Sequence, residues 1–239
     1  MIDAVSNSNS NSEFVKEIKS VFSTYGNWQS FRSRVDSLKS GASEEQARYL
    51  LASKKNYNDA LLGSHRWSSY YAKDFVFSLL KKYPTIGDSA LLTGPEPVRL
   101  ICLSNGFYSD IKVLDKLAKS GTINERRIAA KGCSIKVLRS LKKDKDKVVR
   151  KTVFERLGPA ECLDDMLADK MAEIRAMGAE AAPFGYEKLS EIIMKEIAKR
   201  PFSIMVTKVP LDFLPLVLAN RNLKSKWVAK LVQQRMEAS

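Results

Sequence analysis

Apolar residues recur at helical spacing along most of the chain. In residues 13–25, Phe14, Ile18, Val21 and Phe22 fall on one face, as an amphipathic helix requires. Similar stripes predict helices over residues 28–38, 44–62 and 67–83, with a polar break at residues 54–58. Ser43 precedes two acidic residues and is the predicted N-cap of the third helix. Period-two alternation is not sustained anywhere, so the pattern predicts an all-α fold.

From residue 97 onward the helical pattern repeats. Four segments begin with an apolar or basic residue followed by Arg, at spacings of 28, 23 and 25 residues. A helix breaker follows each short helix, and a second apolar segment follows the breaker. The four arginines are Arg99, Arg127, Arg150 and Arg175, and the breakers are Gly106, Gly132, Gly158 with Pro159, and Pro183. Self-similarity at this period predicts stacked units that bury their apolar faces against one another.

The repeat resembles a known family. Residues 149–169, with the sequence VRKTVFERLGPAECLDDMLAD, resemble the leucine-rich repeat variant family, which is related in architecture to HEAT repeats. The resemblance covers roughly residues 97–197 and implies a right-handed α-solenoid of short degenerate helical repeats. Some members carry a cysteine cluster that holds an iron–sulfur cluster. That cluster is absent here, so the resemblance implies architecture only and no cofactor.

These patterns predict four segments. Residues 1–12, rich in Asn and Ser, form a flexible tail because they contain little that a core could bury. Residues 13–93 form an N-terminal helical region with eroded repeats, and residues 94–198 form the repeat array. Residues 199–239 contribute capping helices, including an amphipathic basic helix over residues 223–236, because open solenoid ends must be covered.

Composition excludes several classes of function. Cys102, Cys133 and Cys162 fall at different offsets in successive repeats, so we expect buried small residues in a reducing setting rather than metal ligands. With His65 as the only histidine, we expect no metal and no catalytic residue. The chain lacks a phosphate-binding glycine loop, so no small-molecule substrate is evident. Without a signal peptide or a stretch of about 20 apolar residues, we expect a cytoplasmic protein with no membrane span.

Charge is unevenly distributed along the chain. Residues 112–151 carry fourteen basic and four acidic residues, a net of +10, whereas residues 152–198 carry five basic and ten acidic, a net of −5. Such a cationic segment predicts an anion-binding surface that releases counterions from a polyanion. The predicted site comprises Lys112, Lys116, Lys119, Arg126, Arg127, Lys131, Lys136, Arg139, Lys142, Lys143, Lys145, Lys147, Arg150 and Lys151.

Each charged set has an alternative interpretation. The lysine-rich run at residues 142–151 is equally typical of a solvated turn. The repeated arginines either track a polyanion or, as the favoured interpretation, bond carbonyls and carboxylates of adjacent units. The acidic residues Glu161, Asp164, Asp165 and Asp169 recur at helical intervals and are compatible with a general acid/base pair or a magnesium site. Such a set is far more typical of a solvated face or of a complement to the basic repeats.

One further motif interleaves basic and aromatic side chains, as base-stacking surfaces do. It comprises residues 64–67 together with Tyr70, Tyr71 and Lys73. The alternative, which we favour, is an ordinary helix that buries Trp67 and Tyr71 in the core.

Three functions remain open. The first is a non-enzymatic module whose cationic repeats bind the backbone of DNA or RNA. The second is a protein–protein scaffold that assembles with partners or with copies of itself. The third is a DNA glycosylase, by analogy with HEAT-like alkylpurine glycosylases, and it ranks last because no catalytic arrangement can be assigned to particular residues.

Overall fold

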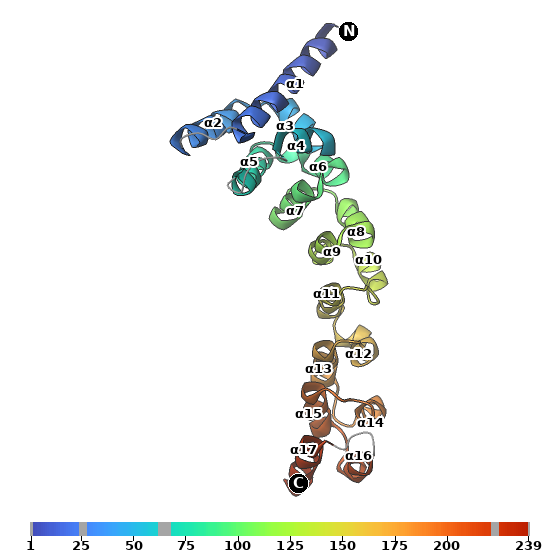
Figure 1. Ribbon diagram of the computed structural model, residues 1–239. Coiled ribbons are helices and arrows are strands. Elements are labelled where there is room, and N and C mark those ends of the chain that lie inside the picture. The colour runs from blue at the N-terminus through green and yellow to red at the C-terminus, as the bar shows by residue number, and fades with distance from the viewer. Residues whose placement is uncertain (1, 24–27, 62–67, 221–224, 239) are drawn as a thin grey trace. The chain divides into compact units, whose positions relative to one another are not determined.

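A computed structural model describes residues 2–23, 28–61, 68–220 and 225–238 (Figure 1). The described residues form helices and loops without strands, which confirms the all-α prediction. Contacts divide the chain into two compact units, residues 1–134 and 135–239. This boundary falls inside the predicted repeat array, so the array is shared between the units.

The first unit packs its helices around a core of buried aliphatic and aromatic residues. Ile18, Leu50, Phe75 and Leu79 are fully buried in it, and the predicted stripe on the first helix faces inward. Ser43 caps α3 by accepting a hydrogen bond from the backbone N–H of Gln46, as predicted. The helices are α1 (Ile2–Ser23), α2 (Trp28–Gly41), α3 (Glu44–Leu51), α4 (Lys54–Leu61), α5 (Ser68–Lys82), α6 (Gly87–Thr93), α7 (Glu96–Asn105), α8 (Ile111–Ser120) and α9 (Ile123–Ala129), with a 3-10 helix at Pro84–Ile86.

Two sequence predictions differ from the structure of this unit. Helix α1 begins at Ile2, so helix occupies residues 2–12 of the tail predicted over residues 1–12, and the Asn11 amide donates to Glu45 at 3.2 Å. Helix α4 occupies the predicted break at residues 54–58. Its Tyr57 and Leu61 are buried, and α4 packs against α1, so tertiary packing overrides the weak helix propensity of Asn56 and Asn58.

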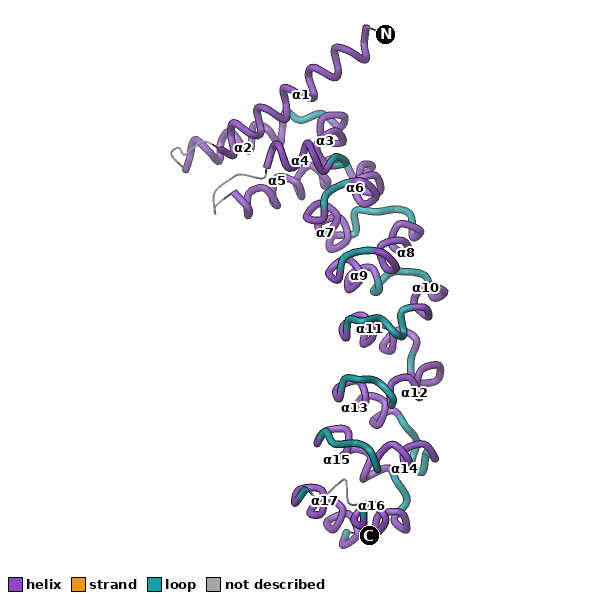
Figure 2. Tube along the Cα trace, turned by 45° about the vertical axis from the view of Figure 1, so that its right-hand side comes forward, coloured by secondary structure: helices purple, strands orange, loops and turns teal. Residues whose placement is uncertain are grey.

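The second unit is a regular array. Helices α11, α13, α15 and α17 form one row, and α12, α14 and α16 lie beside them in a second row (Figure 2). Buried residues such as Leu167, Ala179, Leu189 and Phe202 form a continuous core between successive helices. The helices are α10 (Ile135–Ser140), α11 (Lys147–Leu157), α12 (Pro159–Leu167), α13 (Ala172–Ala181), α14 (Glu187–Ile193), α15 (Lys199–Lys208), α16 (Leu214–Ala219) and α17 (Lys226–Glu237), with a 3-10 helix at Leu211–Phe213.

Breakers predicted from the sequence end helices in both units. Gly106 ends α7 in the left-handed conformation, with φ of 71°. Gly158 has φ of 78° and ends α11, and Pro159 begins α12, where a missing N–H is tolerated. Pairs of short helices joined in this way form a helical-repeat solenoid. No helix in the described part of the chain is long and apolar enough to cross a membrane.

Candidate anion-binding site

The repeated arginine occupies one structural position, four residues after the N-cap of a helix. There its guanidinium donates to the backbone carbonyl five residues before it. The four bonds are Arg99 to Gly94 at 2.5 Å, Arg126 to Gly121 at 3.0 Å, Arg150 to Lys145 at 3.2 Å and Arg175 to Lys170 at 3.1 Å. Arg126 therefore holds the position that the sequence analysis gave to Arg127, because Thr122 is the N-cap of α9.

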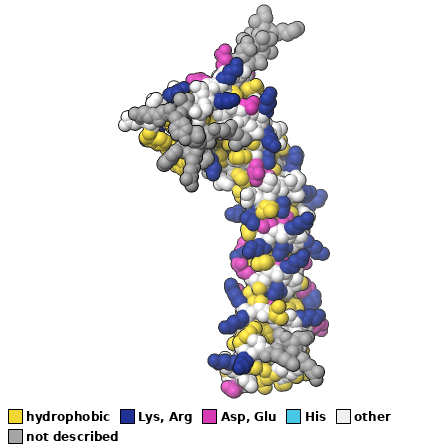
Figure 3. All heavy atoms as spheres, in the orientation of Figure 1, with side chains coloured by type: hydrophobic (Ala, Val, Ile, Leu, Met, Phe, Trp, Pro, Cys, Tyr) yellow, Lys and Arg dark blue, Asp and Glu magenta, His cyan; other side chains and the backbone are white. Residues whose placement is uncertain are grey.

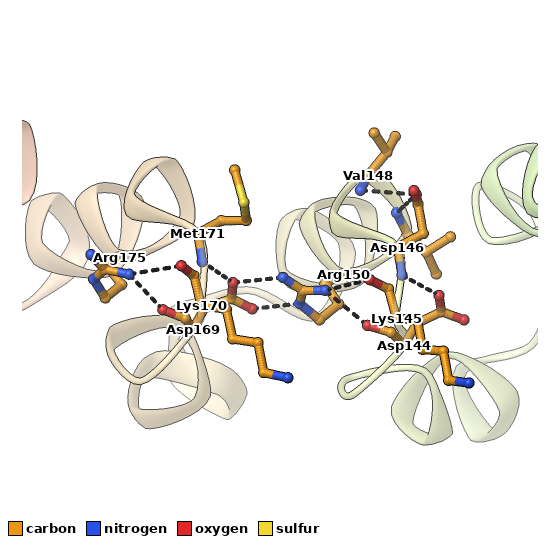
Figure 4. Close-up of polar contacts among 10 residues, drawn as sticks. Asp144, Lys145, Asp146, Val148, Arg150, Asp169, Lys170, Met171 and Arg175 are labelled. Carbon is orange, nitrogen blue, oxygen red and sulfur yellow. Dashed lines mark hydrogen bonds and ion pairs between the residues drawn. The ribbon is translucent and has the colours of Figure 1, made fainter. Parts of the chain in front are cut away.

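In the second unit, Arg150 and Arg175 each also bind a carboxylate from the following repeat. Arg150 donates from Nε and Nη2 to the two carboxylate oxygens of Asp169, at 2.6 and 2.8 Å (Figure 4). The side chains of Arg150 and Asp169 are only 9% and 4% exposed. Arg175 binds Glu196 in the same bidentate way, at 2.6 and 2.8 Å. These contacts confirm the favoured interpretation, in which the arginines hold adjacent repeats together.

The partner carboxylate has two origins. Asp169 and Glu196 lie two residues before the N-caps Met171 and Ala198, and each accepts the backbone N–H of its N-cap residue. Arg99 instead bonds Glu125, which forms a capping box at the start of α9. The difference arises because the residue two before the N-cap of α9 is Ser120, whose side chain is uncharged and cannot form an ion pair with arginine.

The arginines shift the pKa values of their partners. Burial raises the pKa of Asp169, but hydrogen bonds from Arg150 and from the Met171 N–H, together with the charge of Arg150, lower it further. The same opposition acts on Glu196 beside Arg175, and on Glu125 beside Arg99. All three pKa values lie below the usual range, so these carboxylates stay ionised while the repeats remain stacked.

Several other cations of the predicted site are also paired. Arg139 donates to Glu161 at 2.8 Å, Lys142 binds Asp165 at 3.1 Å, and Lys151 binds Glu173 at 2.7 Å. Lys188 and the Tyr186 hydroxyl bind Asp164. Glu161, Asp165 and Asp169 therefore complement the basic repeats, as one interpretation held, whereas Asp164 binds Lys188 of the acidic segment.

The remaining lysines of the predicted site are exposed and have no ion-pair partner among the described residues. The two units divide them. Lys112, Lys116, Lys119 and Lys131 lie in the first unit with Arg126 and Arg127, and Lys136, Lys143, Lys145 and Lys147 lie in the second. The fourteen predicted residues are therefore divided between the two units. Basic side chains project along the second unit among scattered acidic ones (Figure 3).

A cleft of about 340 Å³ lies among the loops of the second unit. Five basic and three acidic side chains line it. Asp165 and Asp169 are paired with Lys142 and Arg150, so their charges are offset. The lining residues are Lys142, Lys143, Asp144, Lys145, Arg150, Asp165, Ala168, Asp169 and Lys170.

Lys145 and Lys170 occupy equivalent positions at this cleft. Each is the residue before an N-cap, each gives its carbonyl to the arginine of its own repeat, and both side chains extend to the same side (Figure 4). Lys170 is not among the predicted site residues, because charge summed over long windows places it in the acidic segment. Its placement five residues before Arg175, like that of Lys145 before Arg150, is the signal that identifies it.

Two other sets of predicted residues have different outcomes. Cys102, Cys133 and Cys162 are buried, as expected, and burial raises the pKa of the Cys102 thiol to about 12. Residues 64–67, including His65 and Trp67, lie outside the described residues.

Comparison with solved structures places this fold beside a known repeat protein. The matched chain is described as a leucine-rich repeat variant with a novel repetitive protein structural motif, with a TM-score of 0.52 and 22% sequence identity. The match covers 69% of this chain and 66% of the other. It confirms the resemblance in fold that the repeat predicts. Comparison with protein-family models gave no match, and neither did comparison with curated proteins.

Proposed function

We propose that the second unit binds nucleic acid through its phosphate backbone, at the cleft between the loops that precede α11 and α13. One observation carries the proposal: Lys145 and Lys170 present two ammonium groups from equivalent positions in consecutive repeats. Lys143 adds a third exposed cation to the same lining. Spaced lysines without carboxylate partners suit a chain of phosphates, since each contact releases a counterion.

The ion pair between Arg150 and Asp169 supports the same assignment, because it leaves the unpaired lysines as the cations available to a ligand. Because Asp169 already neutralises Arg150, that guanidinium serves the stack, although both residues line the cleft. Lys142 is likewise held by Asp165. The binding residues we assign are therefore Lys143, Lys145 and Lys170.

The test replaces these three lysines with serine. Binding of a fluorescent oligonucleotide is measured by anisotropy over a range of salt concentrations. The triple variant should bind at least about tenfold more weakly, and its log–log salt slope should be smaller in magnitude by about two. Its helicity and melting should be unchanged, since the three side chains are exposed and form no hydrogen bond or ion pair among the described residues.

A charge-matched control separates a site from bulk attraction. Lys195, Lys226 and Lys230 lie in the same unit, are exposed, and have no ion-pair partner among the described residues. Replacing all three with serine removes the same charge away from the cleft. Equal losses in the two triple variants would overturn the cleft assignment, and no binding by the unmodified protein at about 50 mM salt would overturn nucleic-acid binding itself.

A scaffold function has its own supporting observation. Leu211, Leu216 and Leu218 are 41%, 56% and 37% exposed, in the 3-10 helix at Leu211–Phe213 and in α16. Exposed apolar groups of this kind are typical of protein contact surfaces. Sedimentation of the purified chain tests this alternative, and a strict monomer at high concentration would argue against self-assembly.

A further inference from the structure

The loop before α15 repeats the geometry of the loops before α11 and α13. In each loop a carboxylate lies two residues before the N-cap and accepts the backbone N–H of the N-cap residue. The bonds are Asp144 with Asp146 at 2.8 Å, Asp169 with Met171 at 2.7 Å and Glu196 with Ala198 at 2.8 Å. The three N-cap residues have φ between −84° and −91° and ψ between 123° and 128°. The residue between the carboxylate and the N-cap therefore holds an equivalent position in three consecutive repeats.

This position carries Lys145, Lys170 and Ile197. The side chains of Lys145 and Lys170 extend to the same side (Figure 4). Because the three loops share their backbone geometry, the side chain of Ile197 lies on the same edge of the second unit, one repeat beyond Lys170. We refer to Lys145, Lys170 and Ile197 as the loop row.

Ile197 is exposed on a loop that is firmly held. At 78% it is the most exposed large apolar side chain among the described residues. Its neighbour Glu196 is only 3% exposed and binds Arg175 at 2.6 and 2.8 Å. The same carboxylate accepts the backbone N–H groups of Ile197 and Ala198. An apolar group presented by a fixed loop costs little ordering when a ligand covers it, so Ile197 is suited to binding rather than to the core.

The loop row places two ammonium groups and one apolar group in line. Lys143 lies beside the two row lysines, and all three are exposed without an ion-pair partner among the described residues. The carboxylates on this edge already bind protein groups: Asp144 the Asp146 N–H, Asp165 the Lys142 ammonium and Asp169 the Arg150 guanidinium. Three cations within two repeats suit a polymer with a charge at every residue better than a peptide, whose carboxylates are more widely scattered.

We propose that the cleft takes a single-stranded nucleic acid, and that Ile197 packs against a base of the strand whose phosphates bind Lys145 and Lys170. This inference rests on the proposed function and names the form of nucleic acid bound there. The bases of a single strand can turn toward a protein, whereas those of a duplex are paired and stacked inside it. A single strand can therefore bring phosphates to the lysines and the apolar face of a base to Ile197.

The test changes Ile197 without changing charge. Ile197→Ala is compared with Ile197→Leu, which keeps the apolar surface, and with Leu216→Ala, which removes an exposed apolar side chain outside the row. Three probes of about 12 nucleotides are used: a single strand, a duplex, and a single strand whose sugars carry no bases. We expect Ile197→Ala to weaken binding of the ordinary single strand about fivefold and to leave the other two probes unchanged. Both control variants should bind like the unmodified protein.

A second variant tests whether Ile197 lies on the path of the strand. Ile197→Lys adds a third ammonium group to the loop row. It should tighten binding of the strand without bases about threefold and increase the magnitude of its log–log salt slope by about 0.7. An unchanged slope would place Ile197 away from the strand and overturn the inference.

The outcomes separate this inference from the proposed function. If the triple lysine variant loses binding of the ordinary strand and Ile197→Ala does not, the base contact is overturned and the cleft stands. The reverse result overturns the cleft. A strand that reaches Ile197 passes Lys195, so the charge-matched variant should lose some affinity, though less than the cleft variant. An equal loss on all three probes, or Ile197-dependent binding of a glutamate- and leucine-rich peptide in place of the single strand, would overturn the base contact.

Discussion

The loop residue before each arginine-bearing helix differs between the two units. It is glycine in the first unit, at Gly94 and Gly121, and lysine in the second, at Lys145 and Lys170. A Cβ atom on Gly94 would lie 2.4 Å from the carbonyl oxygen of Ala90 and 2.5 Å from that of Leu51. All four positions give their carbonyl to an arginine. The carbonyl at this position therefore accepts a hydrogen bond from arginine in both units. A side chain larger than that of glycine fits only where no neighbouring backbone atom lies close to the Cβ position.

The largest expected effect concerns Arg150, which holds the arginine position that recurs in both units. Arg150→Ala should destabilise the second unit by about 3–5 kcal/mol, because it leaves the Asp169 carboxylate buried without a partner. Urea unfolding monitored by circular dichroism measures the loss. The double replacement Arg150→Met with Asp169→Leu is the control and should recover most of the stability. A loss below about 1 kcal/mol would place this pair among ordinary surface ion pairs.

A smaller loss of stability is expected when Gly94 of the first unit is replaced. Gly94→Ala should destabilise the first unit by about 1–3 kcal/mol, because the added methyl group meets two backbone oxygens that cannot rotate away. Lys145→Ala, at the equivalent position in the second unit, should change stability by less than about 0.5 kcal/mol. Similar losses in the two variants, measured by urea unfolding, would show that the loops are equally constrained.

Acid should produce a graded loss in both units. The pKa values of Glu125, Asp169 and Glu196 are lowered in the folded protein, so their stabilisation is complete above the ordinary values of 4.5 for Glu and 3.8 for Asp. It is lost as the pH falls through the lower folded values, where the native carboxylates take up protons. Urea midpoints between pH 6 and pH 3 measure this dependence. Asp169→Asn should make the decline shallower, and an unchanged profile would contradict the assignment.

Much of the fold follows from short-range patterns. The apolar stripe at Ile18 and Phe22 predicts a helix face that is buried, and Gly158 with Pro159 predicts a helix end followed by a new start. These signals act within a turn or two of helix, so the sequence displays them directly. Helix at residues 54–58 was missed because α4, which carries the buried Tyr57, packs against α1, which lies far away in sequence.

The candidate site was predictable only in part. Net charge located a cationic segment, but it could not separate Arg150, which is bound to Asp169, from Lys145, which is exposed. That separation depends on a carboxylate one repeat further along. Lys170 was not predicted for the converse reason, because the negative charge of its acidic neighbours exceeds its own charge in any long window. Aligning loop positions between repeats, rather than summing charge, recovers both residues.

The arginine pairs also bear on how the chain assembles. They join residues only 26, 19 and 21 positions apart: Arg99 with Glu125, Arg150 with Asp169, and Arg175 with Glu196. Contacts between residues this near in sequence close small loops, which favours rapid folding. A repeat can dock on its predecessor as soon as its carboxylate leaves the ribosome. The pairs therefore suit a protein that folds during its own synthesis, one repeat at a time.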